Sequence, residues 1–251
     1  MLLNNKTAIV TGSSKGIGRG LAGYLASNNK LFLNSRSEND LRIEKEKLIN
    51  DYHAEVEYIS GDVTCINDCK KILNYFLDRQ VKLDLVIANV GNGSSDEAKM
   101  FDHEEWLKVF NLNFFSTLNI ILTLLPIMNP TSSIICISSI CGLKKVTGAP
   151  ISYSVAKSSI NKLVELIADD LYKFNKIRIN ALALGNILFE GSVWNKKLKN
   201  NNNNTLEYIK HNVIMNKFGS IDDVFNAVDY LINSKFITGS VHVLDGGQVV
   251  K

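Results

Sequence analysis

Seven short runs of aliphatic and β-branched residues recur along the chain and alternate with longer segments. These runs occupy residues 6–10, 30–35, 56–60, 83–88, 132–138, 177–184 and 240–245. Several are apolar almost throughout, which is typical of strands covered on both faces. The segments between them, such as 38–52 and 153–174, show the apolar spacing of helices. This alternation predicts a doubly wound, Rossmann-type parallel sheet of about seven strands with helices on both faces.

The chain has 251 residues, of which 45% are hydrophobic, and this suits one compact α/β domain spanning residues 1–251. No internal repeat or Pro/Ser-rich linker divides it. A segment at about 186–213 interrupts the alternation and contains an asparagine run at 200–204. Asparagine has low helix propensity, so we expect the run to be an exposed, mobile link. We interpret the whole segment as an insertion that covers a ligand, the alternative being an ordinary surface loop.

Composition and charge exclude several classes of protein. The net charge is only +3, and Lys and Arg are scattered among acidic residues, which argues against nucleic-acid binding. The first residues do not resemble a signal peptide, and the longest apolar stretch, 118–128, is too short to span a bilayer. Cys65, Cys69, Cys136 and Cys141 form no CxxC pair. We therefore expect a cytoplasmic protein with reduced cysteines, no metal and no membrane contact.

The segment 11–18, TGSSKGIG, places three glycines between the first expected strand and the following helix. Gly12 allows a tight turn, Gly16 allows a pyrophosphate to approach the backbone, and Gly18 allows the helix to pack close to the strand. Free N–H groups and the helix dipole favour an anion there. The pattern predicts a dinucleotide site, with a plain tight turn as the alternative.

Further motifs follow in order: GDVT at 61–64, ANVG at 88–91, ISS at 137–139, YSVAK at 153–157 and DGG at 245–247. With the Gly-x3-Gly-x-Gly turn, they resemble the short-chain dehydrogenase/reductase family, in its short Tyr-x3-Lys branch. The resemblance covers nearly the whole chain. It implies reversible hydride transfer between a nicotinamide cofactor and a carbonyl or secondary alcohol, the cofactor supplying the hydride.

The resemblance implies four catalytic residues, of which Tyr153 and Lys157 form the acid/base pair. They are four residues apart on an expected helix and therefore share a face. A neighbouring ammonium favours the phenolate, so we expect Lys157 to lower the pKa of Tyr153 toward neutrality. In the family this lysine also holds the nicotinamide ribose.

A serine and an asparagine complete the implied set. Ser139 would hydrogen-bond the substrate oxygen; the adjacent Ser138 is the alternative, although a hydroxyl satisfied by the backbone suits Ser138 better. The spacing from Trp106 favours Asn113 over Asn111 as the residue that holds a relay water. An asparagine inside a helix is intrinsically unfavourable, which is consistent with a functional role.

The implied cofactor contacts fall on Gly12, Ser14, Lys15, Gly16, Ile17, Gly18, Arg36, Ser37, Asp62, Val63, Asn89, Gly91, Tyr153, Lys157 and Ile187. The Asp62 side chain and the Val63 backbone would face the adenine. Ser35 stands where NAD enzymes of the family place Asp, and Arg36 follows it. With Lys15 as a second cation, this charge pattern favours NADP over NAD. The alternative is that Arg36 only stacks on the adenine.

The chain departs from the family pattern after the sixth strand, where Leu184 replaces proline and no threonine follows at the usual spacing. Segments 91–96, 142–152 and 186–213 would line a pocket for a small carbonyl or alcohol. The lysines at 144, 145, 196 and 197 could meet an anionic substrate or remain solvated. Other interpretations are a catalytically silent dinucleotide-sensing or scaffold protein and an acyl-carrier enoyl reductase. The resemblance also implies a homodimer or homotetramer.

Overall fold

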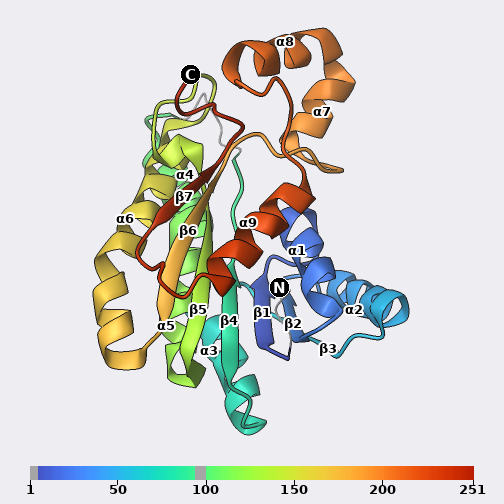
Figure 1. Ribbon diagram of the computed structural model, residues 1–251, viewed down its shortest axis with the longest axis vertical. Coiled ribbons are helices and arrows are strands. Elements are labelled where there is room, and N and C mark those ends of the chain that lie inside the picture. The colour runs from blue at the N-terminus through green and yellow to red at the C-terminus, as the bar shows by residue number, and fades with distance from the viewer. Residues whose placement is uncertain (1–4, 94–99) are drawn as a thin grey trace.

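The computed structural model describes residues 5–93 and 100–251, and its centre is a sheet of seven parallel strands (Figure 1). The strands are β1 Thr7–Thr11, β2 Lys30–Ser35, β3 Val56–Ser60, β4 Leu83–Ala88, β5 Met128–Ser139, β6 Arg178–Leu184 and β7 Val241–Leu244. Their spatial order is β3-β2-β1-β4-β5-β6-β7. The order reverses between β1 and β4, which is where a doubly wound sheet opens a crevice for a ligand. The predicted fold class is confirmed.

Helices cover both faces of the sheet. They are α1 Gly16–Ala26, α2 Glu38–Tyr52, α3 Ile66–Asp78, α4 His103–Phe110, α5 Ser116–Leu124, α6 Ile151–Asn175 and α9 Ile221–Asn233. One hydrophobic cluster joins the sheet to α3, α5 and α6, and the other joins it to α1, α2 and α9. In β1, Ile9 enters the first cluster while Ala8 and Val10 enter the second. Successive side chains on a strand point to opposite faces, so strands covered on both faces are apolar throughout.

The strand register aligns the carboxyl ends of the strands at one edge of the sheet. Thr11 at the end of β1 pairs with Asn34 of β2, and Ser139 at the end of β5 pairs with Leu184 of β6. The turns that follow β1, β4, β5 and β6 therefore leave the sheet at the same edge. This arrangement brings the predicted site segments together although they are far apart in the sequence.

The insertion is a pair of helices, α7 Val193–Asn200 and α8 Asn202–Asn212, beyond one end of the sheet (Figure 1). The asparagines at 200–204 are exposed as expected, but nearly all of them are helical, since Asn200 ends α7 and Asn202 begins α8. The side chain of Asn201 accepts a hydrogen bond from the Asn204 N–H at 3.2 Å and caps α8. Asparagine is poor inside a helix but among the best residues at its N-cap. Trp194 of α7 stacks on Tyr208 of α8, with ring centroids 5.2 Å apart.

A continuous helical run, His103–Ile127, comprises α4, a π-helical turn Asn111–Phe115, α5 and a short 3-10 turn. By length and composition alone it could cross a membrane, which is weak evidence because core helices of soluble proteins pass the same test. Ile120, Ile121 and Leu124 pack into the sheet core, whereas Leu122 is exposed.

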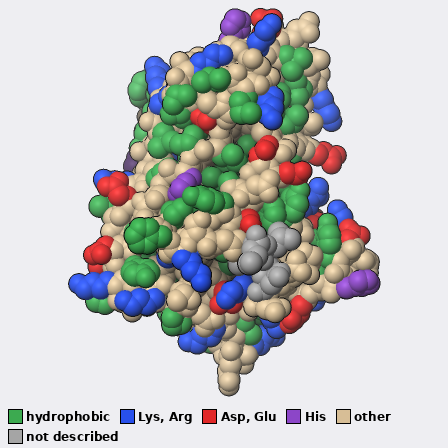
Figure 2. Space-filling view, in the orientation of Figure 1, with side chains coloured by type: hydrophobic (Ala, Val, Ile, Leu, Met, Phe, Trp, Pro, Cys, Tyr) green, Lys and Arg blue, Asp and Glu red, His purple; other side chains and the backbone are tan. Residues whose placement is uncertain are grey.

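On the face of the molecule in Figure 2, basic and acidic side chains are interspersed.

Candidate active site

The glycine turn between β1 and α1 has the backbone geometry that the sequence pattern predicts. Gly12 has φ +64° and Gly16 has φ +61°, both in the left-handed region that favours glycine. A Cβ atom on Gly18 would lie 2.4 Å from the carbonyl oxygen of Gly12, so only glycine lets α1 begin this close to the turn. Asn89, after β4, donates from Nδ2 to the carbonyl of Thr11 at 3.0 Å. The turn is thus a fixed cradle at a helix N-terminus, which fits a dinucleotide pyrophosphate.

Asn113, Lys157 and Gly91 meet beside this cradle. A Cβ atom on Gly91 would lie 2.9 Å from both Asn113 Oδ1 and Lys157 Nζ, so a side chain at 91 would occupy the space these atoms share. Asn113 Oδ1 accepts from the Asn92 N–H at 2.8 Å, and its Nδ2 donates to the Val109 carbonyl at 3.0 Å. Asn113 is buried within the π-helical turn, a feature often found at functional sites. Asn111, the alternative, is exposed.

The structure separates the two candidate serines. Ser138 is buried, and its hydroxyl donates to Asn161 Oδ1 at 2.6 Å, which leaves it occupied in packing β5 on α6. The hydroxyl of Ser139 hydrogen-bonds the Tyr153 hydroxyl and accepts from the Cys141 N–H at 3.2 Å. Ser139 is therefore the serine that lies with Tyr153.

Burial dominates the electrostatics of the Tyr153–Lys157 pair. Burial lowers the pKa of Lys157 to about 8, and it raises the pKa of Tyr153 to about 12, a rise only partly opposed by the Ser139 hydrogen bond. The expected lowering of the Tyr153 pKa by Lys157 is therefore wrong in this structure. Lys157 Nζ donates to the carbonyl of Ile137 at 3.0 Å and lies 5.9 Å from the centre of the Tyr153 ring.

Arg36, Asp62 and Ser37 lie at the carboxyl ends of β2 and β3, near the predicted adenine end of the site. Arg36 is 72% exposed, and its Nη1 lies 3.8 Å from Asp62 Oδ2. Asp62 Oδ1 accepts from the N–H and hydroxyl of Thr64, at 2.9 and 2.8 Å. Ser37 caps α2 by accepting from the Asp40 N–H at 3.3 Å. The Arg36 guanidinium is thus exposed beside the Asp62 carboxylate at the carboxyl ends of β2 and β3.

The remaining predicted contacts occupy varied environments. Lys15 is exposed at the start of α1, Ser14 is half-buried in the turn, and Ile17 packs against the second hydrophobic cluster. The Val63 side chain is buried in the first cluster, and its carbonyl accepts from Asn119 at 3.2 Å, which ties the β3–α3 loop to α5. The structure therefore gives Val63 a packing role.

After β6 lie Ile187 and Phe189, two residues of the segment 186–213 that is expected to line the substrate pocket. Ile187 is buried and bridges to Gly219. Phe189 lies over the glycine turn, since a Cβ atom on Gly16 would be 3.0 Å from its Cε2 atom. The sequence indicates Phe189 only as an apolar residue of the pocket-lining segment 186–213. Nothing in the sequence predicts its contact with a turn more than 170 residues away.

The C-terminal segment also contributes residues that the sequence did not indicate. Lys144 Nζ donates to the carbonyls of Gln248 and Val249, both at 2.9 Å, so Lys144 is neither a solvated charge nor free to bind an anion. Gln248 accepts from Asn186 Nδ2 at 2.7 Å and donates to the Tyr208 hydroxyl at 3.2 Å. The chain end thereby connects the loop after β5, the loop after β6 and α8.

The other expected pocket lysines, at 145, 196 and 197, are exposed. Lys197 lies 4.8 Å from the centre of the Trp194 ring. Of the expected pocket segment 91–96, residues 94–96 lie outside the described residues.

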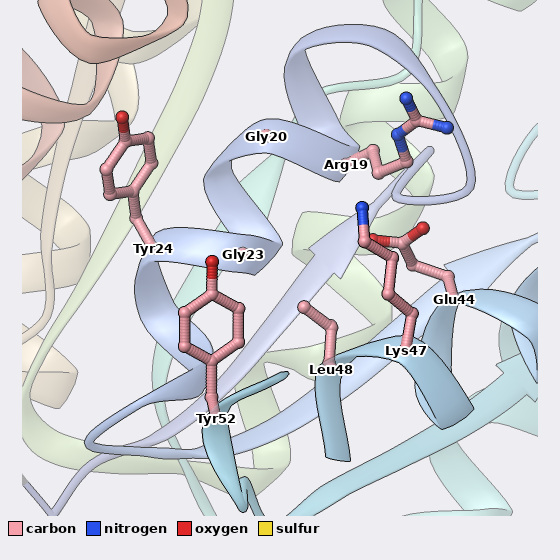
Figure 3. A pocket seen from close by; sticks show the side chains of 8 residues that line it. All are labelled: Arg19, Gly20, Gly23, Tyr24, Glu44, Lys47, Leu48 and Tyr52. Atoms are coloured by element: carbon pink, nitrogen blue, oxygen red, sulfur yellow. The ribbon is translucent and has the colours of Figure 1, made fainter. Parts of the chain in front are cut away.

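A separate pocket of about 280 Å³ lies between α1 and α2 (Figure 3). It is lined by Arg19, Gly20, Gly23, Tyr24, Glu44, Lys47, Leu48 and Tyr52. Glu44 is only 6% exposed, and burial raises the pKa of its carboxyl while Arg19 and Lys47 oppose the rise. Tyr24 hydrogen-bonds Asp222 of α9. None of the residues that line this pocket belongs to the predicted site. The negative charge of Glu44 is offset by the positive charges of Arg19 and Lys47 where α1 packs on α2.

Comparison with known proteins agrees with this geometry. A family model described as enoyl-(acyl carrier protein) reductase matches residues 12–248. The 3-oxoacyl-[acyl-carrier-protein] reductase of Chlamydia trachomatis is 30% identical over 255 aligned positions that cover 98% of each chain. A 7alpha-hydroxysteroid dehydrogenase of Paraclostridium sordellii is 27% identical and covers 98% of this chain and 92% of its own.

Solved structures share the fold. The L-sorbose reductase of Gluconobacter frateurii, complexed with NADPH and L-sorbose, superposes with a TM-score of 0.89 at 22% identity, covering 100% of this chain and 99% of its own. A short-chain type dehydrogenase/reductase from Mycobacterium ulcerans has a TM-score of 0.90 at 22% identity, covering 100% and 92%. The chain therefore belongs to the short-chain dehydrogenase/reductase family, as an oxidoreductase that interconverts carbonyls and alcohols with a nicotinamide cofactor.

Proposed function

We propose that this protein is an NADP-preferring carbonyl reductase that converts a small ketone or aldehyde into an alcohol. The observation that carries the proposal is the meeting of Tyr153, Ser139, Lys157 and Asn113 beside the glycine cradle. They come from three separate parts of the chain, namely β5, α6 and the π-helical turn, and a catalytically silent relative would have no need of the whole set.

The chemistry follows from these side chains. When bound, the cofactor supplies a hydride to the carbonyl carbon. Ser139 hydrogen-bonds the carbonyl oxygen, and Tyr153 donates its phenolic proton to that oxygen as the C=O bond becomes C–OH. Burial raises the pKa of Tyr153, so its phenol carries a proton at neutral pH and has one to donate. Lys157, whose pKa is about 8, and Asn113 lie where they can return a proton to the phenolate.

The preference for NADP rests on Arg36 and Lys15. Arg36 is exposed beside Asp62 at the end of β2, where a 2′-phosphate would compete for its guanidinium. The Gluconobacter structure was solved with NADPH bound, which supports the cofactor class in a protein of this fold. At neutral pH the two cations would favour the phosphorylated cofactor.

A fluorescence titration with NADPH and NADH tests this preference. We expect NADPH to bind more tightly, and Arg36→Ala and Lys15→Ala each to raise its Kd about tenfold, the effect of one charge-assisted contact. Arg42→Ala is the matched control, because Arg42 is an exposed arginine paired with Glu46 on α2. Tighter NADH binding would reverse the cofactor assignment. If the folded protein bound neither cofactor, the scaffold interpretation would replace the proposed function.

The description of the matching family model favours one second candidate, an acyl-carrier enoyl reductase. In such enzymes the tyrosine and lysine are normally farther apart than the four residues between Tyr153 and Lys157. An assay with matched 3-oxoacyl and enoyl thioesters distinguishes the two reactions. Reduction of the carbon–carbon double bond alone would favour the second candidate.

We further propose that the protein is a cytoplasmic homodimer or homotetramer. Large apolar side chains are exposed along the run α4–α5 and on α6, including Leu122, Leu107 and Leu166. Monomeric proteins rarely expose large apolar patches, so we infer that a second copy of the chain covers this surface. Leu122→Lys should lower the molar mass measured by light scattering, and a monomeric wild type would refute this proposal.

A further inference from the structure

A hydrogen-bond chain at the end of the insertion fixes the Tyr208 hydroxyl. Asn186 Nδ2 donates to Gln248 Oε1 at 2.7 Å, and Gln248 Nε2 donates to the Tyr208 oxygen at 3.2 Å. Gln248 is only 4% exposed, and Lys144 holds its main-chain carbonyl at 2.9 Å. The Tyr208 oxygen is therefore an acceptor, and its own proton has no acceptor within residues 5–93 and 100–251.

Packing and hydrogen bonds hold the same hydroxyl where α8 meets the loops after β5 and β6. The half-buried Tyr208 ring stacks on Trp194 with an interplanar angle of 29°. Gln248, which donates to Tyr208, is itself held by Lys144 of the loop after β5 and by Asn186 of the loop after β6. These two loops leave the sheet at the edge where β5 ends in Ser139.

The chemistry around Tyr208 is neutral and polar. Gln248 and Asn186 are amides, and Lys144, which sequence reasoning offered as an anion ligand, donates instead to two main-chain carbonyls. A fixed hydroxyl donor in such surroundings is matched by an uncharged oxygen acceptor, either a hydroxyl or a carbonyl. Donors placed in this way give binding sites their specificity.

We propose that Tyr208 donates a hydrogen bond to a second oxygen of the substrate, and that the substrates are hydroxyketones or diketones rather than simple ketones. The inference rests on the proposed carbonyl reduction, since it concerns the substrate of that same site. Tyr208 contributes specificity, while Tyr153 and Ser139 act on the reacting carbonyl.

Matched substrate pairs test the proposal. Butan-2-one is compared with 3-hydroxybutan-2-one, and cyclohexanone with 2-hydroxycyclohexanone, using wild type, Tyr208→Phe and the control Tyr172→Phe. Tyr172 is an exposed tyrosine on α6, outside the site. For wild type we expect kcat/KM to be at least tenfold higher for the oxygenated member of each pair. Tyr208→Phe should remove this preference, mainly through KM, and leave the plain ketones within twofold.

Three results would overturn the inference. In the first, Tyr208→Phe lowers kcat/KM equally for both members of a pair, which indicates a structural role. In the second, the wild type prefers the plain ketones, so that the reductase proposal stands without this specificity. In the third, the wild type binds NADPH but reduces no carbonyl, so that the proposed function fails and the inference fails with it. Urea unfolding of each variant identifies effects that arise from folding alone.

Discussion

Replacing Lys157 by methionine should stabilise the fold while abolishing the reaction. Lys157 is 3% exposed, and its ammonium donates to one neutral group, the Ile137 carbonyl. No ion pair joins it to a carboxylate in the part of the chain that the structure describes. A buried ammonium without an opposite charge is unfavourable, and burial accordingly lowers its pKa from 10.5 to about 8.

The magnitude follows from that change. At about 1.4 kcal/mol for each tenfold change in proton affinity, the fall from 10.5 to about 8 corresponds to roughly 3 kcal/mol of lost stability at pH 7. Methionine also removes the hydrogen bond to Ile137, at a cost of about 1 kcal/mol. We therefore expect Lys157→Met to raise the free energy of unfolding by about 2 kcal/mol at pH 7.

The pH dependence gives the sharper test. Below pH 8 the lysine is charged in both the folded and unfolded states, so the full penalty is present. Between about pH 8 and 10.5 the folded state releases its proton while the unfolded state still binds it, and wild-type stability rises relative to the variant. The advantage of Lys157→Met should therefore shrink steadily above pH 8.

Urea unfolding followed by tryptophan fluorescence, from pH 7 to 10 under reducing conditions, measures both effects. Lys145→Met is the matched control because Lys145 is exposed nearby, and it should change little at any pH. A variant less stable than wild type at pH 7 would refute the reasoning. A gap that stays constant from pH 7 to 10 would also refute it.

The remaining predictions concern the cradle and the α1–α2 pocket. In Gly18→Ala the new Cβ atom meets the carbonyl oxygen of Gly12, so we expect the free energy of unfolding in urea to fall by about 1–3 kcal/mol and NADPH binding to weaken. Gly23→Ala is the control on the same helix: its Cβ atom meets open space, so we expect it to stabilise α1 by about 0.5–1 kcal/mol. Glu44→Gln should raise the urea midpoint above that of the wild type at pH 7. Because a carboxyl with a raised pKa costs stability only where it is ionised, the difference between the two midpoints should disappear near pH 4. A difference that does not change with pH contradicts this prediction. Phe189→Ala uncovers Gly16 and should speed NADPH association several-fold in stopped-flow fluorescence, whereas an unchanged rate would show that the ring does not obstruct binding.

Patterns of neighbouring residues in the sequence were sufficient to predict the sheet and much of the candidate site. The strands are covered on both faces, so each is apolar throughout and stands out from the helices. Helix α2 was predicted with its observed bounds, Glu38–Tyr52, because its charged and apolar stripes repeat at helical spacing. Gly12, Gly16 and Gly18 were predicted as the turn, since each position needs a backbone or an approach that only glycine allows.

The errors arose where a residue's environment comes from distant segments. Low helix propensity predicts a mobile link at the asparagine run because propensity treats every asparagine alike, whereas the cap that Asn201 provides for α8 depends on its single position. The sequence leaves Lys144 as either an anion ligand or a solvated charge, whereas its partners in the structure are the carbonyls of residues 248 and 249. The pKa of Tyr153 was expected to fall, but burial by the surrounding fold raises it.

The sequence by itself determined the α/β class, the order of the elements and the residue types that could carry hydride-transfer chemistry, because these depend on spacing along the chain. Tertiary structure alone decided that Ser138 is occupied by Asn161, that Phe189 covers Gly16, and that Tyr208 is held by Gln248. The physical reason is that contacts, burial and pKa values depend on which distant segments share a space. In a parallel sheet that sharing is set by strand order and register, which no local pattern contains.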